Sequence, residues 1–81
     1  MKVNLCGKRV KLARVETELK QVELAAALSV EHNIEITQKG ISNIEIGVRR
    51  VTDIELVALA KVLNVSASWL LYGDKIPEKY K

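Results

Sequence analysis

One segment near the middle of the chain, residues 37–49 (TQKGISNIEIGVR), carries residue types that could read the edges of base pairs. In a helix, the spacing places Gln38, Lys39 and Asn43 on one face and Ile41 and Ile44 on the opposite face. Amide side chains can pair with adenine through two hydrogen bonds, and lysine suits the O6 and N7 atoms of guanine. The segment therefore predicts a short helix, over about residues 38–46, that could enter a DNA major groove.

The charged residues are unevenly distributed around this segment, although the net charge is only +3. Residues 1–20 hold six basic and two acidic groups, and residues 37–50 hold three basic groups and one acid. Residues 21–36 between them hold three glutamates and no lysine or arginine. Positive charge thus flanks the segment, which suits contact with phosphates. Ordinary solvated charge is the alternative, and the net charge alone does not decide between them.

Length and composition favour one small globular domain. The chain has 81 residues, of which 48% are hydrophobic, and a single proline. This length permits one core, expected over about residues 5–73, followed by a loosely held tail over residues 74–81. So few residues follow the last predicted helix that we expect no effector-binding domain.

Several functional classes are not expected. Cys6 is the only cysteine, so an internal disulfide is excluded, and we expect it to be half-buried near the first helix. His32 is the only histidine and has no evident catalytic or metal-binding partner. No signal peptide or membrane span is visible. We therefore expect a cytoplasmic protein that is not an enzyme, with no metal, cofactor or membrane partner.

Hydrophobic periodicity predicts an all-α chain of five helices. The first covers about residues 5–16. The second starts at Gln21, and its expected buried residues are Val22, Leu24, Ala25 and Leu28. The third is the segment already described, with Thr37 as its N-cap and Gly47 just beyond its end.

The last two helices have the clearest boundaries. Thr52 and Glu55 have the spacing of a capping box. The apolar stripe that follows consists of Leu56, Leu59, Ala60 and Leu63. Ser66 is the expected cap of a very short fifth helix, which ends at Gly73.

Motifs in a fixed order along the chain resemble the Cro/cI-type (XRE-like) helix-turn-helix family of phage repressors and bacterial regulators. The motifs are GKRVK with Arg14, Leu19 with QVELA, TQxxISxIExG, RxT, LxxLAxxL and VSxxxLLxG, between Gly7 and Gly73. The resemblance implies a compact five-helix lambda-repressor-like domain. Its second and third helices would form the helix-turn-helix, and its third would read the major groove.

The resemblance also implies roles for individual residues. Those expected to face bases are Gln38, Lys39 and Asn43. Those expected to contact phosphates are Gln21, Thr37, Ser42, Arg49 and Arg50. Lys20 is also expected to contact a phosphate, because of its own charge and not because of the resemblance. Arg14 and Glu45 match a pair that family members bury between the first helix and the end of the recognition helix. Two independent surface charges are the alternative for that pair.

Three features depart from the family pattern. Lys20 stands where Ser or Thr normally caps the second helix, and Ser29 stands where glycine normally ends it. About six extra residues lie within residues 30–36, so the turn of the motif is lengthened. This insertion either extends the second helix or forms a longer loop directed away from the DNA backbone. We expect Ile34 and Ile36 to pack on the domain and His32 to lie in a solvated loop.

The leading interpretation is a sequence-specific regulator of transcription that binds double-stranded DNA, and is therefore nucleoid-associated. It would act as a repressor and as a homodimer on a palindromic operator. Trp69, Leu71 and Tyr72 form the expected patch for a second protomer or another protein, because interface cores favour such side chains.

The alternative function is an antitoxin-type or other protein-interaction module with secondary autoregulatory DNA binding. A co-purifying small protein partner would favour this alternative. RNA binding is disfavoured, because the chain lacks the aromatic platform on which bases usually stack.

Overall fold

The computed structural model describes residues 1–74, and this part of the chain contains five α-helices and no strand. The helices are α1 (Gly7–Glu16), α2 (Gln21–His32), α3 (Gln38–Glu45), α4 (Asp53–Leu63) and α5 (Ala67–Tyr72). The predicted all-α fold with five helices is therefore confirmed. The expected loose tail falls outside the described residues from position 75 onward.

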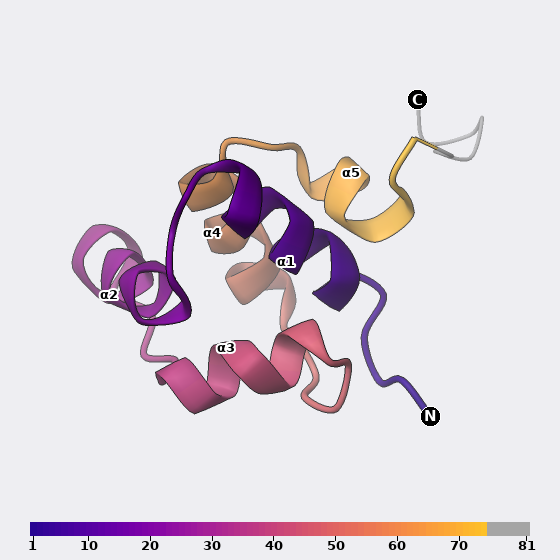
Figure 1. The fold of residues 1–81 in the computed structure, drawn as a ribbon, viewed down its shortest axis with the longest axis horizontal. Helices are drawn as coiled ribbons and strands as arrows, with labels where there is room; N and C mark the ends of the chain where they lie inside the picture. The colour runs from indigo at the N-terminus through magenta and orange to yellow at the C-terminus, as the bar shows by residue number, and fades with distance from the viewer. Residues whose placement is uncertain (75–81) are drawn as a thin grey trace.

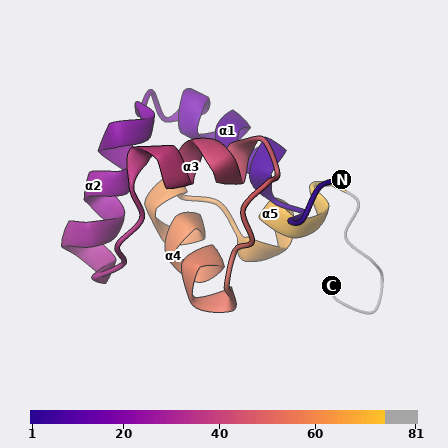
Figure 2. The same cartoon turned by 90° about the horizontal axis from the view of Figure 1, so that it is seen from below.

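Helices α1, α2 and α5 pack around α4, and α3 lies at one face of the bundle. In Figure 1, α1 crosses in front of α4, and α3 runs along the lower side of the molecule with α2 seen end-on beside it. Figure 2, seen from below, shows α3 in front of the other helices. It packs against α1 and α2, while α4 packs against α1, α2 and α5. The fold thus leaves one long side of α3 outside the bundle.

A single apolar core joins all five helices. Its fully buried side chains are Cys6, Val10, Leu24, Leu28, Ile41, Ile44, Leu59, Leu63 and Leu70. Three details of the sequence prediction were wrong. Val22 is exposed because Leu24 and Leu28 occupy the inner face of α2, Cys6 is fully buried, and α1 starts at Gly7 and leaves Leu5 exposed.

Side-chain caps fix the starts of three helices. The hydroxyls of Thr37, Thr52 and Ser66 accept hydrogen bonds from backbone N–H groups in the first turns of α3, α4 and α5. The Thr52 amide donates in turn to the Glu55 carboxylate at 3.0 Å, which completes the predicted capping box. Helix α2 has half of this arrangement, since Glu23 accepts from the Lys20 amide at 2.8 Å while the Lys20 side chain offers no acceptor.

The insertion extends α2 and then connects to α3 through residues without regular secondary structure. The helix continues to His32 and ends at Asn33, whose φ of +55° is left-handed. His32 is therefore a half-buried helix-end residue, and the expected loop position was wrong. Ile34 and Ile36 pack on the core as expected. Ile36 lies so close to α3 that a Cβ on Gly40 would come within 2.7 Å of its Cγ2 atom, so glycine is required there unless Ile36 moves.

A nearly buried ion pair holds the far end of α3 against α1. Arg14 Nε donates to Glu45 Oε2 at 2.6 Å, and Arg14 Nη2 donates to Glu45 Oε1 at 3.1 Å. The side chains are only 12% and 2% exposed, so they are not two independent surface charges. Arg14 Nη1 also donates to the Leu19 carbonyl at 2.9 Å, which ties in the connection between α1 and α2.

We expect Arg14→Ala to lower the free energy of unfolding by about 3–5 kcal/mol, because it leaves the Glu45 carboxylate buried without its cation. Urea denaturation followed by circular dichroism measures this loss. Arg49→Ala is the matched control, since it breaks a more exposed pair expected to contribute at most about 1 kcal/mol. Equal stability losses in the two variants would contradict the structural role of Arg14.

Candidate nucleic-acid interface

The outer side of α3 presents polar side chains, while its inner side is fixed in the core. Gln38 and Lys39 are exposed in the first turn, and Ile41 and Ile44 are fully buried beneath them. Asn43 lies one turn further along and is half-buried. The amphipathic arrangement predicted for the helix is therefore present, with its most accessible side chains at the N-terminal end.

A polar contact chain runs from the buried ion pair to the start of α3. Gln21, the first residue of α2, donates from Nε2 to Glu45 Oε1 at 3.0 Å. Its Oε1 atom accepts from Gln38 Nε2 at 3.4 Å. Gln21 thus orients the Gln38 amide and is itself oriented by Glu45. Sequence reasoning named all three residues but did not anticipate that they touch.

The residues expected to contact phosphates occupy three places. Lys20 and Gln21 lie at the start of α2, where free backbone N–H groups favour anions. Thr37 caps α3, so its hydroxyl oxygen already accepts from Gly40 N at 3.1 Å, and Ser42 is half-buried. Arg49 and Arg50 lie in the connection between α3 and α4.

The two arginines of this connection differ in their environment. Arg49 Nη2 donates to Glu55 Oε2 at 3.0 Å and Nη1 donates to Glu55 Oε1 at 3.1 Å. The hydrogen bonds from Arg49 hold the pKa of the Glu55 carboxyl below its ordinary value, and the same bonds raise the pKa of Arg49. Arg50 is exposed. Arg50 is therefore the more available of the two for an external anion.

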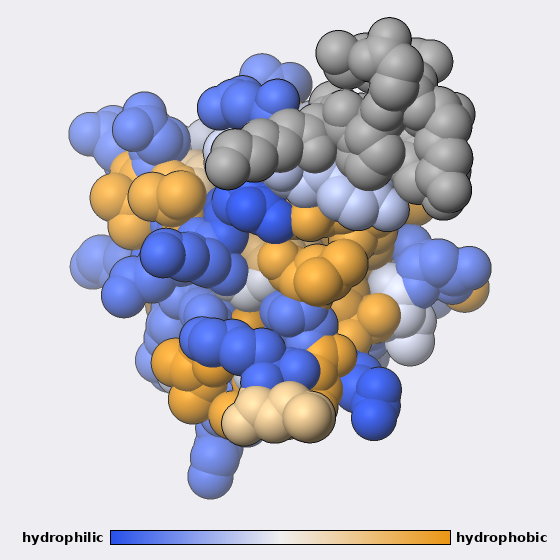
Figure 3. All heavy atoms as spheres, turned by 90° about the vertical axis from the view of Figure 1, so that its right-hand side faces the viewer, coloured by the Kyte–Doolittle hydropathy of each residue, from blue (hydrophilic) through white to orange (hydrophobic). Residues whose placement is uncertain are grey.

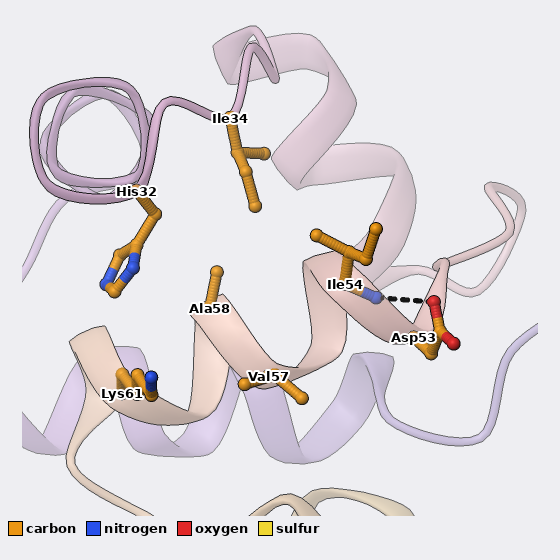
Figure 4. A pocket seen from close by; sticks show the side chains of 7 residues that line it. All are labelled: His32, Ile34, Asp53, Ile54, Val57, Ala58 and Lys61. Atoms are coloured by element: carbon orange, nitrogen blue, oxygen red, sulfur yellow. Dashed lines mark hydrogen bonds between the residues drawn. The ribbon is translucent and has the colours of Figure 1, made fainter.

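An open groove lies between the end of α2 and α4. Figure 4 shows His32 and Lys61 at one end, Asp53 at the other, and apolar side chains between them. The Asp53 carboxylate accepts from the Ile54 amide at 2.7 Å, and it is far from His32 in this view. Within residues 1–74 no group of three or more acidic, histidine or cysteine side chains could hold a metal ion. The described helices are also too short or too polar to cross a membrane.

The predicted partner patch on α5 is less exposed than the sequence suggests. Trp69, Leu71 and Tyr72 are all half-buried, and Trp69 packs against the core. Other apolar side chains are more exposed: Ile54, which lines the groove, is 71% exposed, and Val30 on α2 is 85% exposed. The assignment of Trp69, Leu71 and Tyr72 to a partner surface stays a prediction.

Two residues that organise this region were missed by sequence reasoning. Arg9 donates from Nε to the Leu70 carbonyl at 2.9 Å and from Nη2 to the Leu71 carbonyl at 2.7 Å, which holds α5 against α1. Asn4 contacts the end of α3 and the following connection. The only local signal for Asn4 was its residue type just before a helix, since Asn side chains commonly accept from backbone N–H groups a few residues further along.

Comparison with known proteins finds similarity in both sequence and structure. A family model described as helix-turn-helix matches residues 10–70. The HTH-type transcriptional regulator DicA of Escherichia coli (strain K12) is 35% identical over 69 residues, which cover 85% of this chain and 47% of DicA. The chain thus spans about half the length of this curated relative.

The structure is similar to that of the P22 c2 repressor protein, solved in complex with the synthetic operator 9T in the presence of Tl+. The TM-score is 0.74 at 27% identity, and the match covers 88% of this chain and 98% of the other. The family model covers residues 10–70, and the structural match covers most of the five-helix chain. The chain therefore belongs to the Cro/cI-type helix-turn-helix family.

Proposed function

We propose that the chain is a sequence-specific, double-stranded DNA-binding transcriptional regulator that acts as a repressor by placing α3 in the major groove. The observation that carries this proposal is the exposure of Gln38 and Lys39 on a helix whose opposite side is fixed by Ile41 and Ile44. The relatives support it, since one is a transcriptional regulator and the other is a repressor bound to a synthetic operator.

Base reading depends on Gln38 and Lys39, with Asn43 as a third contact deeper along the helix. The Gln38 amide has the donor and acceptor that adenine requires, and Lys39 suits guanine. The contact with Gln21 restricts the Gln38 side chain before DNA arrives. A restricted side chain loses less conformational entropy on binding, so this contact strengthens the hydrogen bonds of Gln38 to its base.

Phosphate contacts on both sides of α3 fix its depth and orientation in the groove. Lys20 and the N-terminal amides of α2 bind one strand, together with Gln21. Arg50 binds beyond the C-terminal end of α3, while Thr37 at its start and Ser42 within it contribute hydroxyl donors. The Arg49 guanidinium already donates to the Glu55 carboxylate, so in the DNA interface Arg49 mainly holds the α3–α4 connection in place.

The Arg49–Glu55 pair gives a pH-dependent contribution to stability. Because the pKa of folded Glu55 is lowered, the contribution is present above the ordinary carboxyl pKa of 4.5 and is lost as the pH falls through the folded pKa. We expect the native chain to be more stable than Glu55→Gln at pH 7, and the difference to disappear in more acid solution. Urea denaturation from pH 7 to pH 3 measures it. A difference independent of pH would show that the charge of Glu55 is not responsible.

The proposed active form is a homodimer on a palindromic operator. One domain of this size reads only a few base pairs, and two copies about 34 Å apart would contact half-sites one helical turn apart. The half-buried α5 side chains Trp69, Leu71 and Tyr72 are the proposed contact surface.

Selection of the purified chain against random duplex DNA at near-physiological salt tests the proposal. We expect enrichment of a two-fold symmetric sequence whose half-sites lie about ten base pairs apart. An enriched site without symmetry would contradict the dimer but not base reading. Weak, salt-sensitive binding without any sequence preference would contradict the proposal that the chain is a sequence-specific regulator. The antitoxin-type alternative would then be tested by co-purification of a small protein partner.

Substitutions in α3 and α2 separate base reading from phosphate contact. We expect Gln38→Ala and Lys39→Ala each to relax the preference at one base position by about 1–3 kcal/mol. Repeating the selection with each variant measures this change. Gln21→Ala should weaken binding to all sites and relax the Gln38 position slightly, because it removes the contact that orients Gln38. An unchanged selected sequence for Gln38→Ala would show that α3 is not the reading helix.

A further inference from the structure

The residues before α1 cover the C-terminal end of α3. A helix leaves its last carbonyl groups without partners inside the helix. Here Val3 N donates to the Gly47 carbonyl at 2.8 Å, and Lys2 Nζ donates to the Ile46 carbonyl at 3.2 Å. Asn4 Nδ2 donates to the Ile44 carbonyl at 3.0 Å. Three successive residues thus supply donors to the end of the recognition helix.

The Asn4 side chain joins three parts of the fold at once. Besides Ile44, its Nδ2 atom donates to the Arg49 carbonyl at 2.8 Å. Its Oδ1 atom accepts from the Gly7 amide in the first turn of α1, also at 2.8 Å. Both amide hydrogens and the amide oxygen are therefore engaged, and the side chain is held between α1, α3 and the α3–α4 connection.

Two glycines permit this close packing. A Cβ on Gly7 would overlap the Ile44 carbonyl oxygen and would lie 3.0 Å from Asn4 Oδ1. Gly47 has a φ of +84°, and a Cβ there would overlap the Lys2 side chain. The absence of a side chain at Gly7 lets α1 lie against the carbonyl end of α3, and a side chain at Gly47 would displace the Lys2 side chain. The backbone around the hydrogen bonds of Asn4 is therefore closely packed on both partners, at Gly7 in α1 and at Ile44 in α3.

Asn4 acts on the connection at the residue that precedes Arg50. The amides of Val48 and Arg49 donate to the Asn43 carbonyl at 2.9 and 3.3 Å, while Asn4 holds the Arg49 carbonyl. The Arg49 guanidinium is held by Glu55. Arg49 is thus fixed at its amide, its carbonyl and its side chain. Because the peptide group between Arg49 and Arg50 is held in place, the position from which the Arg50 side chain starts is held as well.

We propose that Asn4 is a positioning residue for the DNA interface, which orients the Arg50 side chain toward a phosphate by holding the Arg49 carbonyl. This inference rests on the proposed function. Figure 3 shows the face that carries the N-terminal segment and the α3–α4 connection, on which hydrophilic and hydrophobic residues are interspersed. In this role Asn4 touches no base, so it changes the strength of DNA binding and leaves the preferred sequence unchanged.

The test is a double-mutant cycle of Asn4→Ala and Arg50→Ala, measured as DNA affinity across a range of salt concentrations. Asn4→Ala changes no charge, so a purely structural role would leave the salt dependence unaltered. We expect Asn4→Ala to weaken binding about tenfold and to reduce the slope of log affinity against log salt by about 0.9, which is the loss of one phosphate contact. In an Arg50→Ala background, Asn4→Ala should cause little further loss.

Two further variants keep the test decisive. Ser66→Ala removes a helix cap on α5, remote from the connection, and should leave the salt slope unchanged. Asn4→Ser retains a hydroxyl that can accept from Gly7 but is too short to reach Arg49, so it should repeat the slope change even if Asn4→Ala does not fold. Additive losses in the cycle, or an unchanged slope in both Asn4 variants, would overturn the positioning role. Absence of DNA binding by the native chain would overturn the proposed function itself.

Discussion

The buried contact between Arg14 and Glu45 is the constraint on which the position of α3 depends. Glu45 is the last residue of that helix, and its carboxylate meets the guanidinium on one side and the Gln21 amide on the other. The Glu45 carboxylate has almost no contact with solvent, so if it lost these two partners its charge would be left buried and uncompensated. The orientation of α3 is therefore fixed at its far end by electrostatics and beneath its middle by apolar packing. The first turn can then be polar without loosening the helix.

Local signals made most of the fold predictable. The Thr52–Glu55 capping box and the stripe from Leu56 to Leu63 depend only on residues within one helix, and both appear as expected. Val22 was misassigned because the sequence does not tell which side of α2 faces the core. The path of the insertion depends on the left-handed conformation of Asn33 and on the packing of Ile36 against Gly40 of α3. Both are tertiary outcomes, and so the sequence left two alternatives open.

The candidate site divides in the same way. Gln38 and Lys39 were identified from residue type and helical spacing, and the family resemblance supplied the pairing of Arg14 with Glu45. The hydrogen bonds of Asn4 to Ile44 and Arg49 join residues that are 40 and 45 positions apart in the sequence, so no local sequence pattern predicts them. The bond between Gln21 and Gln38 likewise depends on how two helices cross. Residue chemistry is thus visible in a sequence, whereas mutual support between residues requires the folded arrangement.

The packing of Ile36 against Gly40 limits which positions of α3, the proposed recognition helix, could change to give a new specificity. Positions 38 and 39 point outward and can change side chain without disturbing the domain. A Cβ at position 40, directly beside them, would come within 2.7 Å of Ile36 Cγ2, so a side chain there requires Ile36 to move. The extra residues that lengthen the turn therefore narrow the set of positions available for change. Divergence of binding preference among close relatives that carry the same insertion would have to proceed through the positions on either side of this glycine.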